Sequence, residues 1–429
     1  MKNTNEKTRR ALVLWLSGIG LEDIRALPEI DDLISQGAIA GLEPSPITGV
    51  QTQYYQAITG LSPASFGFFD ALLPLCRHPQ PDLYPSLDGY TVVEAGASRG
   101  TPPEKLPDLL RAANWRVAYK ELVPSTLGGG VQDLTRPASD SATCIIVMCA
   151  PGALPRGQLA SAFAEAIEEA ARAAREWVGE TGLLALLSES RPAPVKRFVN
   201  LNNFLIDMGL IECDEKTGLI DWSNSLAYFV GHGQLWVNLL GRDPRGAVHP
   251  QHEYEEVRES LLQALPHKLR DPETGEQVIE RVYRKEELYP AEYLFCAPDL
   301  VVVFKPGYAP SPESALLRRD EEALTLPSAG QTATAGMHPS TVGGFLLVAA
   351  PGVAAGVSVP GPAPLVAAVP SLLYTLGSRY VGMGSQPVAA LFSSSYLTDH
   401  PIDMEVRDRE LSEEDEELVI NRLRDLGYI

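Results

Sequence analysis

Continuous apolar runs constrain the fold of this chain more than any other feature of its sequence. Residues 11–16 read ALVLWL, residues 144–148 read CIIVM and residues 183–187 read LLALL. The runs 300–304 and 345–349 have the same character. Runs of this length without alternating polar residues are typical of strands that are buried on both faces of a parallel sheet. We therefore expect these segments to be buried β-strands.

Segments with helical periodicity lie between the apolar runs. In residues 27–36 and 159–178, apolar side chains recur at spacings of three and four, which places them on one face of a helix. Residues 370–376 form a short candidate helix that ends at Gly377. Strands that alternate with helices predict an α/β fold, in which helices cover both faces of a mostly parallel sheet.

The residues that directly follow the apolar runs are the first candidates for a functional site. In open α/β sheets, ligands bind beyond the carboxyl ends of the strands. The positions to consider are therefore Ser17, the stretch after Met148 and residues 188–191, with the loop before Phe345 as a neighbour.

The middle of the chain has a different texture. Residues 191–325 are dense in polar and aromatic side chains, among them Trp222 and Tyr254, and contain turn sequences such as DPETG. We interpret this stretch as a cap inserted into a core that residues 1–190 and 326–429 form.

Charge and cysteine usage limit the possible partners and compartments. The formal net charge of −20 argues against binding nucleic acid through a broad basic surface. The five cysteines include no CxxC pair, which is typical of reduced thiols in a cytoplasmic protein. We therefore expect a cytoplasmic protein with no nucleic-acid partner.

The N-terminus has some likeness to a signal peptide, because Arg9 and Arg10 precede the apolar run 11–16. The run is short, however, and Glu22 and Asp23 soon follow it, so a first buried strand is the better interpretation. No segment has the roughly 18 uninterrupted apolar residues that a membrane helix needs. The sequence predicts no membrane span.

Several short motifs follow one another in an order that resembles a known family. They are TGLSPASFG at 59–67, NLNNFL at 200–205, IDWS at 220–223, AY at 227–228, VNLLGR at 237–242, RDPETG at 270–275, APDL at 297–300, PGY at 306–308 and LGYI at 426–429. Together they resemble the type I phosphodiesterase/nucleotide pyrophosphatase branch of the alkaline phosphatase superfamily, most closely its bacterial phosphohydrolase or phosphomutase members. The resemblance spans nearly the whole chain and implies an alkaline-phosphatase-like three-layer core with an inserted cap.

The resemblance also implies a site with two divalent metals, usually zinc, and a Thr or Ser nucleophile. Ser17 stands where the family has its first ligand, an Asp, and is a poor zinc ligand. Val50 stands at the nucleophile position and has no nucleophilic atom. Thr52 is a weak substitute, since it needs a register shift and otherwise reads as a loop hydroxyl that bonds its own backbone. Residues 150–156, where the family has an Asp and a His, contain neither, nor a Glu.

The remaining ligand positions are also depleted. Glu189 and Ser190 stand where the family has Asp and His, so Glu189 would still offer oxygen while Ser190 would not replace an imidazole. Arg191 follows and would repel a cation. His338 matches a family ligand, although Pro339 replaces the Arg after it. Of the seven expected positions, one keeps its residue type and one is a conservative change.

We therefore predict a pseudoenzyme that serves as a binding or assembly module and requires no cofactor. Its partner would be another protein, such as an active paralogue or the other subunits of a complex, or further copies of itself. The vestigial pocket, bordered by Ser17, Val50, Glu189–Arg191 and His338, would bind an anionic ligand without hydrolysing it.

One alternative remains open. The chain would instead be a metal-dependent phosphodiesterase or phosphohydrolase if zinc or another divalent metal were held by a rearranged set such as Glu189, His338 and Asp70.

Overall fold

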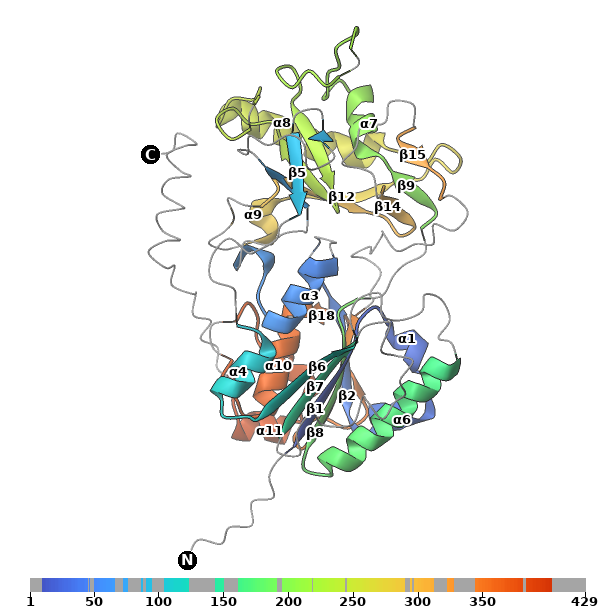
Figure 1. The fold of residues 1–429 in the computed structure, drawn as a ribbon, viewed down its shortest axis with the longest axis vertical. Helices are drawn as coiled ribbons and strands as arrows, with labels where there is room; N and C mark the ends of the chain where they lie inside the picture. Colours follow the sequence, from blue (N-terminus) through green and yellow to red (C-terminus); the bar gives the residue numbers. More distant parts are fainter. Residues whose placement is uncertain are drawn as a thin grey trace, which may run out of the picture.

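The structure, a computed structural model, describes residues 10–44, 46, 50–65, 72–75, 86–87, 90–94, 104–122, 143–149, 161–190, 195–217, 219–243, 245–289, 294, 297–311, 322–327, 344–380 and 383–402. The chain forms two lobes (Figure 1). The lower lobe contains the largest sheet, and the upper lobe contains smaller sheets.

The lower lobe is built on an eight-stranded sheet with the order β17-β2-β16-β8-β1-β7-β6, and β18 also pairs with β2. Its strands are β1 (Ala11–Leu16), β2 (Ala38–Glu43), β6 (Val117–Leu122), β7 (Cys144–Cys149), β8 (Leu183–Ser188), β16 (Gly344–Ala349), β17 (Val357–Ser358) and β18 (Ala363–Pro364). β1 pairs in parallel with β7 and β8, and β6 pairs in parallel with β7. β16 is antiparallel to its neighbours β8 and β2. The predicted, mostly parallel sheet is confirmed.

Four of the apolar runs form the centre of this sheet, as β1, β7, β8 and β16. Two further strands, β2 and β6, were not predicted. β2 is broken by Gly41, and β6 carries Lys120 and Glu121, so neither sequence reads as a continuous apolar run.

Helices cover both faces of the sheet. One face packs against α2 (Pro28–Gln36) and α6 (Ser161–Val178). The other packs against α3 (Val50–Thr59), α4 (Leu106–Ala112), α10 (Ala368–Thr375) and α11 (Ser394–Asp399). The predicted helices at 27–36, 159–178 and 370–376 correspond to α2, α6 and α10. A short helix, α1 (Leu21–Ile24), follows β1.

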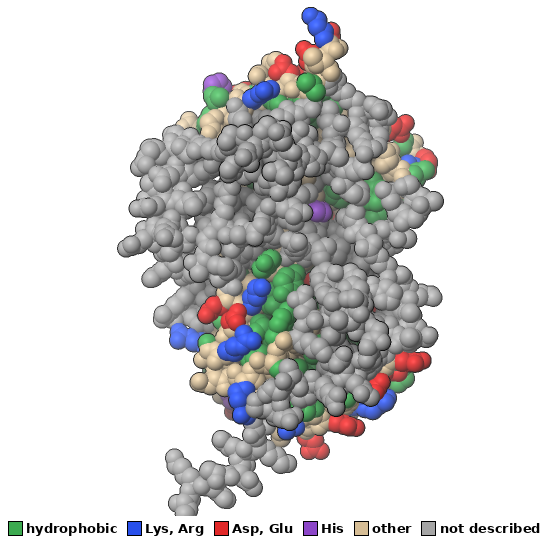
Figure 2. Space-filling view, viewed as in Figure 1, with side chains coloured by type: hydrophobic (Ala, Val, Ile, Leu, Met, Phe, Trp, Pro, Cys, Tyr) green, Lys and Arg blue, Asp and Glu red, His purple; other side chains and the backbone are tan. Residues whose placement is uncertain are grey.

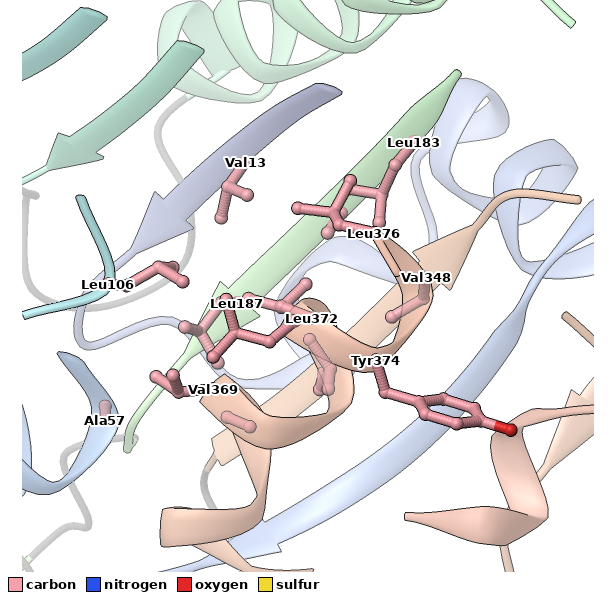
Figure 3. Packing of buried hydrophobic residues seen from close by; sticks show 14 of the residues in the cluster. Val13, Ala57, Leu106, Leu183, Leu187, Val348, Val369, Leu372, Tyr374 and Leu376 are labelled. Atoms are coloured by element: carbon pink, nitrogen blue, oxygen red, sulfur yellow. The ribbon is translucent and has the colours of Figure 1, made fainter. Parts of the chain in front are cut away.

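The side chains of β1 alternate between these two layers, as strand geometry requires. Leu12, Leu14 and Leu16 belong to the cluster under α2 and α6, whereas Val13 and Trp15 belong to the cluster under α3 and α10. Figure 3 shows this second cluster, in which Val13, Leu183, Leu187 and Val348 from the strands meet Val369, Leu372 and Leu376 from α10 and its C-terminus. Burial on both faces explains why the strands have apolar residues at every position.

The upper lobe contains an antiparallel sheet with the order β10-β11-β13-β12. Its strands are β10 (Ala227–Gly231), β11 (Gln234–Val237), β12 (Ile279–Arg284) and β13 (Leu300–Phe304). The helix α8 (His252–Lys268) packs on this sheet, and α7 (Leu201–Asp207) and α9 (Lys285–Leu288) lie nearby. The run 300–304 is thus a buried strand, but of this sheet rather than of the central one.

Two three-stranded sheets complete the upper lobe. One contains β9 (Arg197–Val199), β14 (Tyr308–Pro310) and β15 (Leu324–Thr325). The other contains β3 (Leu72–Leu75), β4 (Ser86–Leu87) and β5 (Tyr90–Glu94), and β3 lies next to β10. Residues from the first hundred of the chain therefore lie beside the sheet that residues 227–304 form.

A buried ionic cluster holds the upper lobe together. The guanidinium of Arg242 donates to both carboxylate oxygens of Asp299, each at 2.8 Å, and Tyr254 donates its hydroxyl to Asp299 at 2.7 Å. Although burial opposes the charged form, attraction by Arg242 and Lys285 lowers the pKa of Asp299 well below its ordinary value. Arg242 and Asp299 both belong to the short motifs that carry the family resemblance. These motifs therefore have a structural role in the upper lobe.

Two asparagines of the same motifs satisfy backbone groups in the interior. The side-chain amide of Asn202 donates to the carbonyl of Phe229 at 2.8 Å and accepts from the N–H of Phe229 at 2.7 Å. It thus makes the two hydrogen bonds that the backbone of a neighbouring strand would make. Asn238 donates to the carbonyls of Trp222 and Ser225. Without these hydrogen bonds, each of these carbonyl groups would be buried without a partner, which would lower the stability of the fold.

Candidate functional site

The candidate site lies at the carboxyl ends of β1 and β8. These strands are adjacent and parallel, so their carboxyl ends meet at one edge of the sheet. In Figure 1, α1, which follows β1, lies at the end of the lower lobe that faces the upper lobe. Ser17 directly follows β1, and Glu189 directly follows β8.

Glu189 is joined to β1 by two hydrogen bonds. The indole Nε1 of Trp15 donates to Oε2 of Glu189 at 2.7 Å, and the hydroxyl of Ser17 donates to Oε1. Trp15 lies near the end of β1, and Ser17 is the first residue after it. Glu189 is only 1% exposed and Ser17 only 2%. Both carboxyl oxygens are therefore engaged from within the protein.

The environment of Glu189 disfavours its charge. Desolvation by burial raises the pKa of Glu189, and the hydrogen bonds from Ser17 and Trp15 only partly offset that effect. Among the described residues, no Lys or Arg forms an ion pair with this carboxyl group. Burial thus makes the carboxylate form, which a metal ligand must have, less favourable than it is in water.

The neighbouring serines are also buried. Ser188 donates its hydroxyl to the carbonyl of Ser190 at 3.1 Å. The hydroxyl of Ser190 has no hydrogen-bond partner within the described part of the chain. A Cβ at Gly344 would lie 2.7 Å from the carbonyl oxygen of Glu189, so β16 can pass this closely only because position 344 has no side chain.

The helix α3 carries Val50, at the predicted nucleophile position, and Thr52, its predicted weak substitute. Val50 is its first residue, and Thr52 lies in its first turn and is fully buried. The interpretation of Thr52 as a loop hydroxyl is therefore wrong, because the chain is helical there. The ring of Tyr54 lies 5.5 Å from that of Trp15, which brings α3 against the strand that precedes Ser17.

Several predicted site residues lie outside the described residues. These are Arg191, His338, Asp70 and the stretch 150–156. Of the predicted positions, the structure thus brings Ser17 and Glu189 into contact and places Ser190 beside them.

The described residues do not fit a pair of divalent metal ions. Such a centre needs several carboxylate or imidazole donors for each ion, at about 2 Å. No group of three or more His, Cys, Asp or Glu side chains converges anywhere among the residues that the structure describes. At the ends of β1 and β8, the carboxyl group of Glu189 already accepts a hydrogen bond at each oxygen.

Sequence reasoning missed the part that Trp15 plays. A signal was present, because a Trp in an otherwise aliphatic buried strand needs an acceptor for its Nε1 proton. The acceptor, Glu189, is 174 residues away in the sequence.

No helix in the described part of the chain has both the length and the apolar character that crossing a bilayer requires.

Comparisons with known proteins identify relatives of the fold. No protein-family model and no curated protein sequence matches the chain. Among solved structures, an inactive murine ectonucleotide pyrophosphatase/phosphodiesterase 5 in complex with AMP is 11% identical, with a TM-score of 0.54, and covers 90% of this chain and 100% of its own. A second structure of the murine protein has the same identity and coverage and a TM-score of 0.52. The human protein is 10% identical, with a TM-score of 0.50, over 91% of this chain and 99% of its own.

At these identities the likeness establishes the fold alone. It confirms the predicted fold class, a mixed α/β core with a mostly parallel sheet like that of the ectonucleotide pyrophosphatase/phosphodiesterase structures.

Proposed function

We propose that this chain is a catalytically degenerate protein of the nucleotide pyrophosphatase/phosphodiesterase fold, of the kind found in the bacterial phosphohydrolase branch, that acts as a binding or assembly module. The observation that carries the proposal is the state of Glu189. Its carboxyl group is buried, has a raised pKa because of that burial, and accepts one hydrogen bond at each oxygen, from Trp15 and from Ser17.

The chemistry of phosphoryl transfer explains why this state matters. Hydrolysis of phosphate esters on this fold is implied to use metal ions that clamp the attacking and leaving oxygens. A carboxyl group whose pKa is raised by burial, and whose two oxygens already accept hydrogen bonds, is a weaker ligand for such an ion than a solvated carboxylate. Ser17 offers no accessible substitute nucleophile, since its side chain is buried.

The proposed partner is a protein, either a different subunit or a second copy of this chain. On the face drawn in Figure 2, described acidic and basic side chains are interspersed rather than gathered into one basic field. The proposal accordingly includes no nucleic-acid partner. Cys144 and Cys213 are free thiols, which supports the cytoplasmic location that remains part of the proposal.

The proposed ligand of the vestigial pocket is an anion that is bound and not cleaved. AMP is a suitable probe, because the murine protein of the same fold has been solved with AMP. Binding would be measured by calorimetric titration with AMP and with inorganic phosphate, each in the presence of EDTA.

The proposal is tested by metal analysis and by an ester assay on the purified full chain. We expect substoichiometric zinc and manganese, and no turnover of nitrophenyl phosphate or bis-nitrophenyl phosphate above the rate of buffer with either metal added. Light scattering on the same sample would show whether the chain forms an oligomer. Stoichiometric metal together with turnover would contradict the proposal.

A hydrolase remains the second candidate, and the fold favours it because its structural neighbours are named phosphodiesterases. Its metals would be held by Glu189, His338 and Asp70. In that case a Glu189→Gln variant would lose both metal and turnover, since an amide cannot supply the anionic oxygen.

A further inference from the structure

Trp15, Ser17 and Glu189, at the tips of β1 and β8, match one another as hydrogen-bond donors and acceptors. Trp15 has a single indole donor and Ser17 has a hydroxyl, and each reaches a different oxygen of Glu189. In the interior an unpaired polar atom costs the full loss of its hydration, so a matched set is strongly preferred to a partly matched one. Removal of Glu189 would leave two buried donors without acceptors.

The same set connects the sheet to the helix above it. The backbone register places Trp15 opposite Leu187, so the indole begins on β1 and its Nε1 reaches the residue that follows β8. On its other side the indole lies against Tyr54 of α3. Strand β1, the tip of β8 and helix α3 are thus held by one side chain, whose orientation Glu189 fixes.

We propose that Trp15, Ser17 and Glu189 form a metal-independent brace that ties the carboxyl ends of β1 and β8 together, at the edge where α/β folds bind their ligands. Trp15 and Ser17 are positioning residues in this brace. The inference rests on the proposed non-catalytic function, since a brace and a metal ion would compete for the same carboxyl group. The brace also predicts that a Gln at position 189 holds Trp15 and Ser17 in place to the same extent as Glu189 does.

The experiment compares three variants of the full chain by thermal unfolding in EDTA and in zinc. Glu189→Gln keeps an acceptor for Trp15 and a polar partner for Ser17, so we expect its apparent Tm to stay within about 2 °C of the wild type. Glu189→Ala leaves both donors unpaired, and we expect a fall of about 2–6 °C. Glu180→Gln, at an exposed position, is the matched control and should change nothing.

A second measurement reports on the brace directly. In a sample with ¹⁵N-labelled tryptophan, the Nε1 proton of Trp15 should exchange slowly with solvent in the wild type and in Glu189→Gln. If Glu189→Ala does not fold, Trp15→Phe serves in its place, because it removes one of the two hydrogen bonds while it keeps a ring against Tyr54. We expect an intermediate loss of Tm for that variant.

The outcomes separate this inference from the proposed function. Stabilisation of the wild type by zinc that disappears in Glu189→Gln would overturn the brace, even if no ester is cleaved. Ester turnover that survives in Glu189→Gln would overturn the non-catalytic function and leave the brace in place. An unchanged Tm in Glu189→Ala would also overturn the brace.

Discussion

Burial of a carboxyl group away from basic side chains disfavours its charged form and raises its pKa. Glu189 is in this situation, since burial raises its pKa above the ordinary value of 4.5. A group whose pKa is higher in the folded than in the unfolded state contributes stability that is complete below the unfolded pKa. That contribution is lost as the pH rises through the folded pKa.

The stability of the protein should therefore depend on pH through Glu189. We expect the Tm of the wild type, relative to that of Glu189→Gln, to fall as the pH rises from about 4 to about 8, because only the acid titrates. Differential scanning fluorimetry of the two proteins across this range measures the difference. The Glu180→Gln control should run parallel to the wild type, and a wild-type advantage that grew with pH would show that the carboxylate is the favoured form.

The residues at the site also show how far sequence could reach. The sequence placed Ser17 and Glu189 near strand ends, because Ser17 directly follows the run 11–16 and Glu189 comes two residues after the run 183–187. The bond between them could not be foreseen, since it depends on a sheet order in which β8 pairs with β1.

Helix α3 is the element that sequence patterns described least well. Thr52, Gln53 and Gln56 are at most 1% exposed, so polar residues face the interior on this helix and no apolar stripe marks it. At its C-terminal end the chain turns at Gly60, which has φ +69 and lies against α10. Close packing there, rather than helix propensity, determines where the helix lies.

Gly60→Ala should consequently destabilise the lower lobe more than a similar change in open space. A Cβ at Gly60 would lie 3.1 Å from both Val369 and Pro370, in addition to the strain of a positive φ. Gly179→Ala, after α6, has nearly the same φ of +66 but meets nothing within 4 Å. We expect about 1–2 kcal/mol of destabilisation from the left-handed backbone in both variants, and a further loss only in Gly60→Ala. Urea unfolding provides the comparison, and equal losses would refute the role of packing.

At the scale of the whole molecule, the large hydrophobic clusters each belong to one lobe, and only a small fourth cluster joins Ala64 to Tyr289, Ala297 and Val301 among the described residues. Trp222 and Trp236 belong to the cluster of the upper lobe, and Trp15 belongs to one of the clusters of the lower lobe. Domains with separate cores often unfold as separate cooperative units. We therefore expect thermal unfolding in two transitions, with a calorimetric enthalpy that exceeds the van't Hoff enthalpy.

The buried pair of Arg242 and Asp299 allows the transitions to be assigned. Arg242→Ala leaves the Asp299 carboxylate buried without its main partner, which typically costs about 3–5 kcal/mol. We expect only the transition of the upper lobe to move to lower temperature. Arg281→Ala, at a side chain that is 59% exposed, is the control and should have little effect. A shift of both transitions by the same amount would mean that the lobes unfold as one unit.

The sequence by itself determined which strands are buried, since four uninterrupted apolar runs became the centre of the large sheet. It also determined that polar residues follow two of these runs, at Ser17 and at residues 188–190. These properties depend on local hydrophobicity and on residue type, which can be read without knowing the pairing.

Only the tertiary structure decided what those polar residues do. The partners of Glu189 lie more than 170 positions earlier in the chain, so their hydrogen bonds exist only once β1 and β8 are neighbours. The strands β2 and β6 have mixed sequences. They form strands through their pairing with β16 and β7, respectively. Contacts between distant segments have no local signature, because they depend on the order in which the strands are arranged.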